Sequence, residues 1–209
     1  MDISHLGLTK WPQELVLLAR VRSILAQANK LTIMPSIGLT FKNLEFLNLS
    51  RNELTNIDDI HFREMTFLKK LDLSRNKLVT LPNDIIKLPQ LTILYVQNNK
   101  LNKFPDNMRE LRSLNTIDAS VNDFVSIGDQ LENIPNLEDL NLKDCKLLKT
   151  GILDMGTRTR RLYEKRILMT SKIERRALIT RALNIQKTAL IREQNIIYQA
   201  IDNNDKKYP

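Results

Sequence analysis

The sequence predicts an α/β repeat solenoid followed by a basic α-helical extension, and three observations support this prediction. Leucines spaced as Leu-x-x-Leu-x-Leu recur at a nearly constant interval through residues 1–150. One slot follows each group of leucines at the same distance, and it holds Asn29, Asn52, Asn76, Asn99, Asn122 and Cys145. Glycine and proline are both absent from residues 157–201, where good helix formers dominate.

Residues 68–90 show why the repeated phrase needs these residue types. Leu71 and Leu73 alternate with polar residues, which is typical of a short strand that buries one face. The chain must turn at Asn76, whose side-chain amide can bond backbone groups that would otherwise be buried without partners. A single unit of 23 residues cannot bury its leucines alone, so its neighbours complete the core. We therefore expect stacked units joined by a ladder of asparagines.

The period and the phrase together resemble the leucine-rich-repeat superfamily over residues 1–150. A Leu-Pro-like step recurs as Met34-Pro35, Leu81-Pro82 and Phe104-Pro105, which resembles the intracellular Ras-suppressor-like class of these repeats. The resemblance implies a solenoid of about six and a half units in residues 1–150, with residues 151–209 as the helical extension. It also implies a structural role for Cys145, because cysteine is a permitted substitute in the asparagine slot.

The cysteine content and the chain start bear on the location of the protein. The chain has one cysteine, whereas extracellular relatives of these repeats carry disulfide-bridged caps. The start, MDISHLGLTKWPQE, lacks the basic and apolar regions of a secretory signal, and no apolar run reaches membrane-spanning length. We expect an intracellular, cytoplasmic protein without a membrane span.

Nothing in the sequence indicates catalysis. His5 and His61 stand apart from each other and from any spaced cysteine or carboxylate partner. Asp58 and Asp59 fall in a turn, where solvation is the ordinary outcome for carboxylates. The five glycines are scattered, so no phosphate-binding loop is present. We expect a non-enzymatic protein with no metal and no cofactor.

Residues 151–209 carry most of the positive charge. They hold 13 Lys/Arg against 6 Asp/Glu, while residues 1–150 hold 19 against 18. The spacing of Ser171 and Glu174 fits a capping box, so the run is either one long helix or two helices. Apolar residues on several faces of this helix indicate contact with more than one surface. Leu183, Leu190 and Ile197 are the candidates for docking a partner; a simple cap on the array and a disordered tail are the alternatives.

Five basic residues are concentrated at the start of the extension: Arg158, Arg160, Arg161, Lys165 and Arg166. This cluster could meet the phosphates of RNA or an acidic protein surface. Few aromatic side chains accompany it, and stacking platforms for single-stranded nucleic acid normally need them. The sequence leaves open whether the extension binds protein or RNA.

The outward positions of the expected strands form columns on the concave face of the solenoid. Phe46, Ile93 and Tyr95 occupy such positions, although their neighbours in sequence already fill the core. Apolar anchors among charged residues are typical of protein-binding surfaces. The candidate partner-binding residues are Phe46, Arg51, Lys70, Asp72, Arg75, Ile93, Tyr95 and Asp118.

The function expected from the resemblance is protein binding, because most members of the superfamily bind proteins. We therefore expect an adaptor or a structural subunit of a larger assembly, with an unidentified protein partner on the concave face. The alternative is an RNA-bound or ribosome-associated subunit held by the basic extension. The repeat pattern begins in the middle of a unit, with Leu6 in the asparagine slot, so residues 1–20 are a further place where a partner could cover the array.

Overall fold

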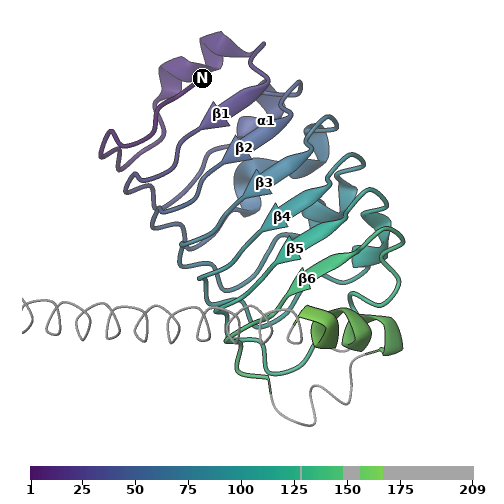
Figure 1. Cartoon of the computed structure of the whole chain (residues 1–209). Coiled ribbons are helices and arrows are strands. Elements are labelled where there is room, and N and C mark those ends of the chain that lie inside the picture. Colours follow the sequence, from purple (N-terminus) through teal and green to yellow (C-terminus); the bar gives the residue numbers. More distant parts are fainter. Residues whose placement is uncertain (128, 148–155, 167–209) are drawn as a thin grey trace, which may run out of the picture. The chain divides into compact units, whose positions relative to one another are not determined.

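The computed structural model describes residues 1–127, 129–147 and 156–166 (Figure 1). Six short strands, each of three residues, stack side by side in chain order as one parallel sheet. They are β1 (Ser23–Leu25), β2 (Phe46–Asn48), β3 (Lys70–Asp72), β4 (Ile93–Tyr95), β5 (Thr116–Asp118) and β6 (Asp139–Asn141). The compact unit that contains this sheet runs from Met1 to Arg166. Leu183, Leu190, Ile197 and the Ser171–Glu174 pair lie outside the described residues.

Short helical turns form the opposite side of each unit and carry the chain back to the next strand. They are η1 (Gln13–Leu18), α1 (Ile37–Thr40), η2 (Asp58–Ile60), η3 (Phe62–Glu64), η4 (Asn83–Lys87) and η5 (Met108–Glu110). Pro12 and Pro82 directly precede η1 and η4, where a fixed φ near −66° suits entry into a helical turn. Because these return turns are short, the units take up little space along the stacking direction, and the strands of successive units can pair directly.

Block 44–67 is one residue longer than its neighbours and accommodates the difference in its return turn. Two 3-10 turns, η2 and η3, meet at His61, which adopts a left-handed conformation with a φ of 60°. Gly38 of the preceding block approaches this point so closely that an added Cβ would overlap the carbonyl oxygen of His61. A glycine is therefore required at position 38 for the two blocks to stack.

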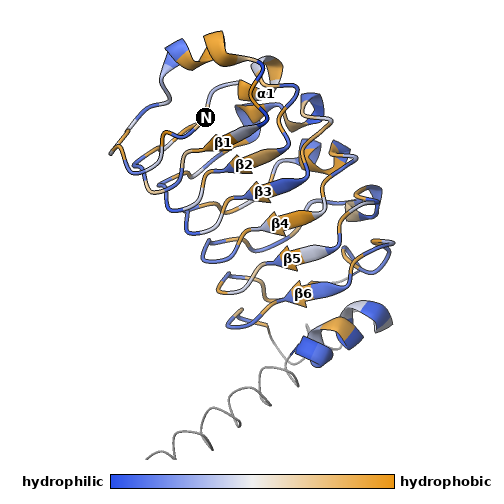
Figure 2. Ribbon diagram, turned by 45° about the horizontal axis from the view of Figure 1, so that its top comes forward, coloured by the Kyte–Doolittle hydropathy of each residue, from blue (hydrophilic) through white to orange (hydrophobic). Residues whose placement is uncertain are grey.

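The core lies between the sheet and the return turns. The middle residue of each strand is buried and the two flanking residues are half-exposed. The aliphatic residues of all the blocks form one continuous cluster, in which Phe104 and Phe124 stack with ring centroids 4.6 Å apart. Figure 2 shows hydrophobic residues recurring at equivalent places from block to block. The predicted repeat solenoid is confirmed.

The asparagine ladder is present and joins each block to the one before it. Asn76 Nδ2 donates to the carbonyl oxygens of Leu73, in its own block, and Leu49, in the preceding one, both at 3.0 Å. Its Oδ1 accepts the backbone N–H of Leu54 at 3.0 Å. Equivalent bonds are made by Asn29, Asn52, Asn99 and Asn122. Each buried side chain therefore satisfies at least three backbone groups that water cannot reach.

The first residues continue the array. Ile3 N–H donates to Leu25 O at 2.8 Å, and Leu25 N–H donates to Met1 O at 2.9 Å, so this segment pairs with the edge of β1. His5 is left-handed, like the residue before each ladder asparagine. This pairing agrees with the prediction that the repeat pattern begins in the middle of a unit. Beyond it, η1 buries none of its residues, and Leu17 is 84% exposed.

Candidate functional site on the concave face

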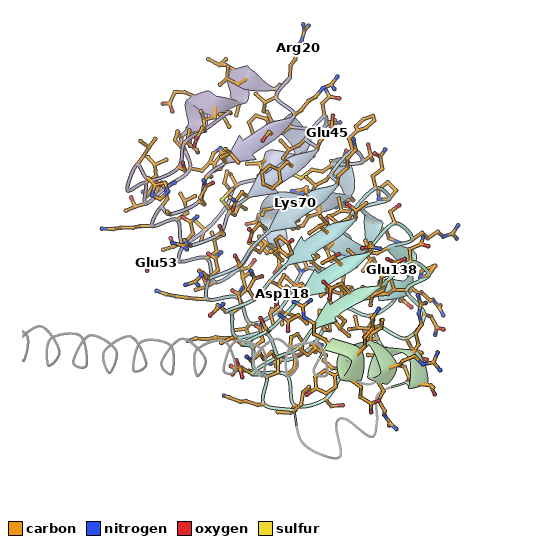
Figure 3. All side chains as sticks on the ribbon, in the orientation of Figure 1. Arg20, Glu45, Glu53, Lys70, Asp118 and Glu138 are labelled. Carbon is orange, nitrogen blue, oxygen red and sulfur yellow. The ribbon has the colours of Figure 1, made fainter. Side chains whose placement is uncertain are left out.

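The outward positions of the strands form the columns that the sequence predicted. The register pairs Phe46 with Lys70 and Lys70 with Ile93 in the first column. Asp72, Tyr95 and Asp118 follow one another in the second column. All of these side chains are half-buried, as expected on the face of a single sheet layer. Figure 3 shows Lys70 and Asp118 on this face.

Lys70 lies between two aromatic rings. Its Nζ is 5.2 Å from the ring centroid of Phe46 and 5.1 Å from that of Tyr95. Both distances are within the reach of a cation–π interaction. The three residues come from the neighbouring strands β2, β3 and β4, so the solenoid brings together side chains that are distant in sequence. The cluster of Phe46, Lys70 and Tyr95 is the centre of the candidate site.

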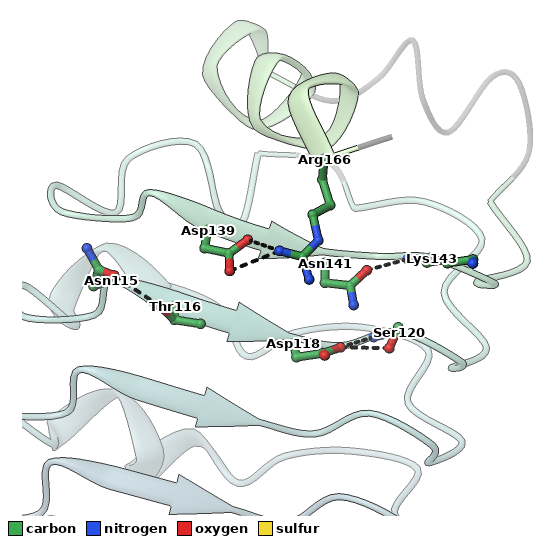
Figure 4. Close-up of polar contacts among 8 residues, drawn as sticks. All are labelled: Asn115, Thr116, Asp118, Ser120, Asp139, Asn141, Lys143 and Arg166. Carbon is green, nitrogen blue, oxygen red and sulfur yellow. Dashed lines mark hydrogen bonds and ion pairs between the residues drawn. The ribbon is translucent and has the colours of Figure 1, made fainter. Parts of the chain in front are cut away.

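Asp72 and Asp118 have a structural task in addition to any role in binding. Asp72 Oδ1 accepts the backbone N–H of Ser74 at 2.9 Å. Asp118 Oδ1 accepts both the N–H and the hydroxyl of Ser120, at 3.0 and 2.7 Å (Figure 4). These are Asx turns that end the strands, and Asn48 makes the same turn with Ser50. The recurring Asp/Asn-x-Ser spacing could have revealed this role in the sequence.

The prediction that Arg51 and Arg75 occupy outward strand positions is wrong, because neither residue lies on a strand. Each strand ends three residues earlier, and both arginines are left-handed with a φ of 55°. The same conformation recurs at Ala28, Asn98, Val121 and Asp144. It is strained for Val121, because β-branched residues rarely adopt positive φ. The Asx turns position these residues, and both arginine side chains are exposed beside the sheet.

Several lysines outside the concave cluster are paired with carboxylates of an adjacent block. Lys69 and Lys77 reach Glu45 and Glu53, each at 2.7 Å. The hydrogen bond from Lys69 lowers the pKa of Glu45, and that from Lys77 lowers the pKa of Glu53. Exposed ion pairs of this kind contribute little to stability, so they align neighbouring blocks more than they stabilise the fold.

Arg158 and Arg166 of the predicted basic cluster contact the array. Residues 157–166 are helical, and Arg158 donates from Nη1 to Ile134 O at 2.7 Å and from Nη2 to Pro135 O at 2.8 Å. Arg166 Nη1 lies 3.0 Å from Asp139 Oδ1 in β6 (Figure 4). Arg161 and Lys165 are exposed, and Arg160 is half-exposed. The cluster is therefore divided between the array and solvent.

The helix at 157–166 is fixed at its start by a carboxylate of the array. Glu132 accepts the backbone N–H of Arg158 at 2.9 Å and that of Thr159 at 3.0 Å, as a capping residue does. Burial alone would raise the pKa of Glu132, but these hydrogen bonds and the guanidinium of Arg158 lower it below its usual value. Leu162 and Tyr163 pack against the core. For residues 157–166, the structure agrees with the interpretation of the extension as a cap on the array.

Cys145 ends the ladder. Its Sγ lies 3.3 Å from Ala119 O, the carbonyl that an asparagine Nδ2 would reach. Unlike an amide, the thiol offers no carbonyl oxygen to the backbone of the preceding block. Burial, with a smaller contribution from Asp118 and other carboxylates, raises the pKa of the thiol from 9.0 to about 11. The thiol is therefore protonated at neutral pH, as a structural cysteine should be.

We expect slow alkylation of Cys145 in the folded protein. The raised pKa reduces the thiolate fraction at pH 8 roughly 100-fold relative to the unfolded chain, and the thiolate is the nucleophile. The rate constant with iodoacetamide should keep rising up to a pH of about 11. The thiol's contribution to stability is full below pH 9 and is lost as the pH rises through about 11. An alkylation rate that levels off near pH 9 would contradict the raised pKa of the buried Cys145 thiol.

Among the described residues, no group of three or more His, Cys, Asp or Glu side chains is placed to hold a metal ion. No helix in the described part of the chain is long and apolar enough to cross a membrane.

Comparison with known proteins identifies the class of the fold. Residues 42–101 match the family model described as leucine rich repeat. A leucine-rich-repeat protein of Leptospira interrogans superposes with a TM-score of 0.67 and 27% identity, over 75% of this chain and 39% of that one. The repeats of this chain are therefore leucine-rich repeats, as the sequence predicted. Their assignment to the Ras-suppressor-like class stays a prediction.

Two further similarities show how much of each relative is covered. The functional domain of InlJ from Listeria monocytogenes, which includes a cysteine ladder, has a TM-score of 0.56 and 25% identity over 68% of this chain and 29% of that one. The probable inactive serine/threonine-protein kinase roco10 of Dictyostelium discoideum is 33% identical over 111 residues, which is 48% of this chain and 4% of that protein. The similarity thus concerns the repeats, whose usual role is protein–protein interaction, and only a small part of each larger relative.

Proposed function

We propose that this protein is a non-enzymatic interaction module, an adaptor or a structural subunit of a larger assembly, which binds a protein partner on its concave face. The observation that supports the proposal best is the cluster of Phe46, Lys70 and Tyr95. Two aromatic side chains held by a lysine are preorganised, and aromatic anchors commonly dominate the energy of protein interfaces. Ile93 stands in the first column beside Lys70 and adds apolar surface.

The extension contributes to this function in two parts. Residues 157–166 cover the end of the array through Glu132 and Arg158, which leaves the concave face of the other blocks available. Docking of a partner through Leu183, Leu190 and Ile197 is part of the proposal, as is the intracellular location inferred from the single cysteine. The RNA-bound alternative ranks second, because Arg158 and Arg166 of the basic cluster already contact the array.

The proposal predicts that the Phe46→Ala/Tyr95→Ala double variant loses its principal protein partner while the array stays folded. Loss of two central aromatic anchors should weaken binding by roughly 2 kcal/mol or more, which is about 30-fold. The measurement is affinity purification of the full chain with quantitative mass spectrometry. Phe67→Ala is the matched control, because Phe67 is 48% exposed but lies outside the strands. If the double variant retains the partner at the level of the control, the site is not on the concave face.

A further inference from the structure

Three cations around the concave cluster have no anionic partner among the described residues. Arg51, Lys70 and Arg75 form no ion pair there, and the only ring or charge contacts of Lys70 are those with Phe46 and Tyr95. Lysines of the flanking positions differ, since Lys69 and Lys77 each pair with a glutamate at 2.7 Å. These two blocks, 44–67 and 68–90, therefore present three cationic groups without an ion-pair partner among the described residues, together with the carboxylate of Asp72.

The two arginines lie in adjacent blocks because of the register. Arg51 N–H donates to Ser74 O, the residue just before Arg75, so the two arginines occupy equivalent turns of adjacent blocks. Adjacent strands are about 4.8 Å apart, so the backbones at the two arginines are similarly close. Lys70 adds a third charge from the first column, beside the rings of Phe46 and Tyr95. Lys70 thus contacts the aromatic anchors, and Arg51 and Arg75 follow five residues after Phe46 and Lys70 in their blocks.

The sign of the charge changes along the array. The turn after β6 carries Asp144 at the position that Arg51 and Arg75 occupy after β2 and β3. In the first column Asp139 stands where β3 has Lys70, and it pairs with Arg166, whereas the second column carries an aspartate in both regions, Asp72 and Asp118. An acidic ligand is therefore attracted to the turns after β2 and β3 more than to the turn after β6. Between the two regions lie the uncharged side chains of Ile93, Tyr95 and Asn98.

We propose that the partner of the concave face is an acidic protein segment with an apolar side chain beside its carboxylates. Its carboxylates pair with Arg51, Lys70 and Arg75, and its apolar side chain packs on Phe46, Ile93 and Tyr95. Arginine is well suited to this task, because its planar guanidinium binds a carboxylate through two parallel hydrogen bonds. This inference rests on the proposed function and names the chemical class of the partner.

RNA fits the same surface less well. Stacking of a base needs an open ring face, and Lys70 lies over the rings of both Phe46 and Tyr95. Asp72 also stands among the cations, and the acidic positions of β5 and β6 oppose a long polyanion. The basic surface extends over two blocks, which suits a short cluster of carboxylates better than a run of phosphates.

The test selects peptides without knowledge of the natural partner. A phage-displayed library of random dodecapeptides is selected on the immobilised full chain and on the Arg51→Gln/Arg75→Gln double variant. Lys100→Gln/Lys103→Gln is the matched control, since both lysines are exposed and lie off the concave face. We expect enrichment of Asp and Glu next to an aromatic or aliphatic residue on the wild type and the control. The affinity of the enriched peptides should fall roughly tenfold or more on the arginine variant.

Each outcome decides the proposal. Selection without an excess of Asp and Glu, or equal affinity for the arginine variant, overturns it. Binding of labelled oligouridine that the arginine variant abolishes, with a log–log salt slope of about −0.7 per contacted phosphate, overturns it in favour of nucleic acid. If Phe46→Ala/Tyr95→Ala loses the partner but the arginine variant keeps it, the acidic class is wrong while the proposed function stands. Both variants should melt within a few degrees of the wild type, because their changed side chains are not in the core.

Discussion

Replacing Asn76 with alanine is expected to lower the free energy of unfolding by about 3 kcal/mol, from unpaired buried backbone groups. The side chain serves the N–H of Leu54 and the carbonyl oxygens of Leu49 and Leu73. All three groups lose a partner at a place that water cannot reach, and the lost bonds join two blocks. Asn99→Ala should have a similar effect, because Asn99 makes the equivalent set of bonds.

Urea unfolding followed by circular dichroism measures this effect. Asn102→Ala is the control, since Asn102 is an exposed asparagine in the same block as Asn99. Cys145→Ser should cost less than either ladder variant, because Cys145 makes one such contact at the end of the ladder. A midpoint for Asn76→Ala that matches that of Asn102→Ala would show that the ladder does not hold the array together.

The Arg158→Ala variant is expected to release helix 157–166 from the array. The guanidinium of Arg158 donates to the carbonyl oxygens of Ile134, Pro135 and Leu137, at 2.7, 2.8 and 3.2 Å. Hydrogen bonds to charged groups contribute roughly 1.5–3 kcal/mol net, and the three bonds share one partly exposed guanidinium, so the total loss should be about 2–3 kcal/mol. Release would also expose Leu162 and Tyr163, which pack against the core.

Hydrogen exchange read by mass spectrometry locates the change. In Arg158→Ala, exchange should accelerate in residues 157–166 and in the last block, but not around the ladder of the first blocks. Arg161→Ala is the matched control, because Arg161 is an exposed arginine on the same helix. Glu132→Gln should give a smaller effect of the same kind, since the amide keeps one acceptor for the helix N–H groups. Equal exchange in Arg158→Ala and Arg161→Ala would mean that the helix is held by its apolar contacts alone.

Much of the fold could be predicted from the sequence, because residues separated by one repeat length lie next to each other in a repeat protein. Residues 23 or 24 positions apart, such as Asn76 and Asn99, become direct neighbours when one unit stacks on the next. The strand register and the two columns of Phe46 and Tyr95 follow from the same interval. The length of the strands did not follow, because the left-handed turn at Arg51 and Arg75 depends on the Asx bonds of the residues before them.

The tertiary structure alone decided how the side chains of different blocks meet. The sequence placed Phe46, Lys70 and Tyr95 on one face, but the position of the ammonium between the two rings depends on the reach and rotamer of a long side chain. The contacts of Arg158 could not be predicted from the sequence either. Its carbonyl partners belong to a loop more than 20 residues earlier in the chain, where the regular pairing of one block with the next has ended. The period of the sequence determines the backbone structure that recurs in every block. Contacts that occur only once, such as those of Lys70 and Arg158, depend on how particular side chains pack at one place in the stack.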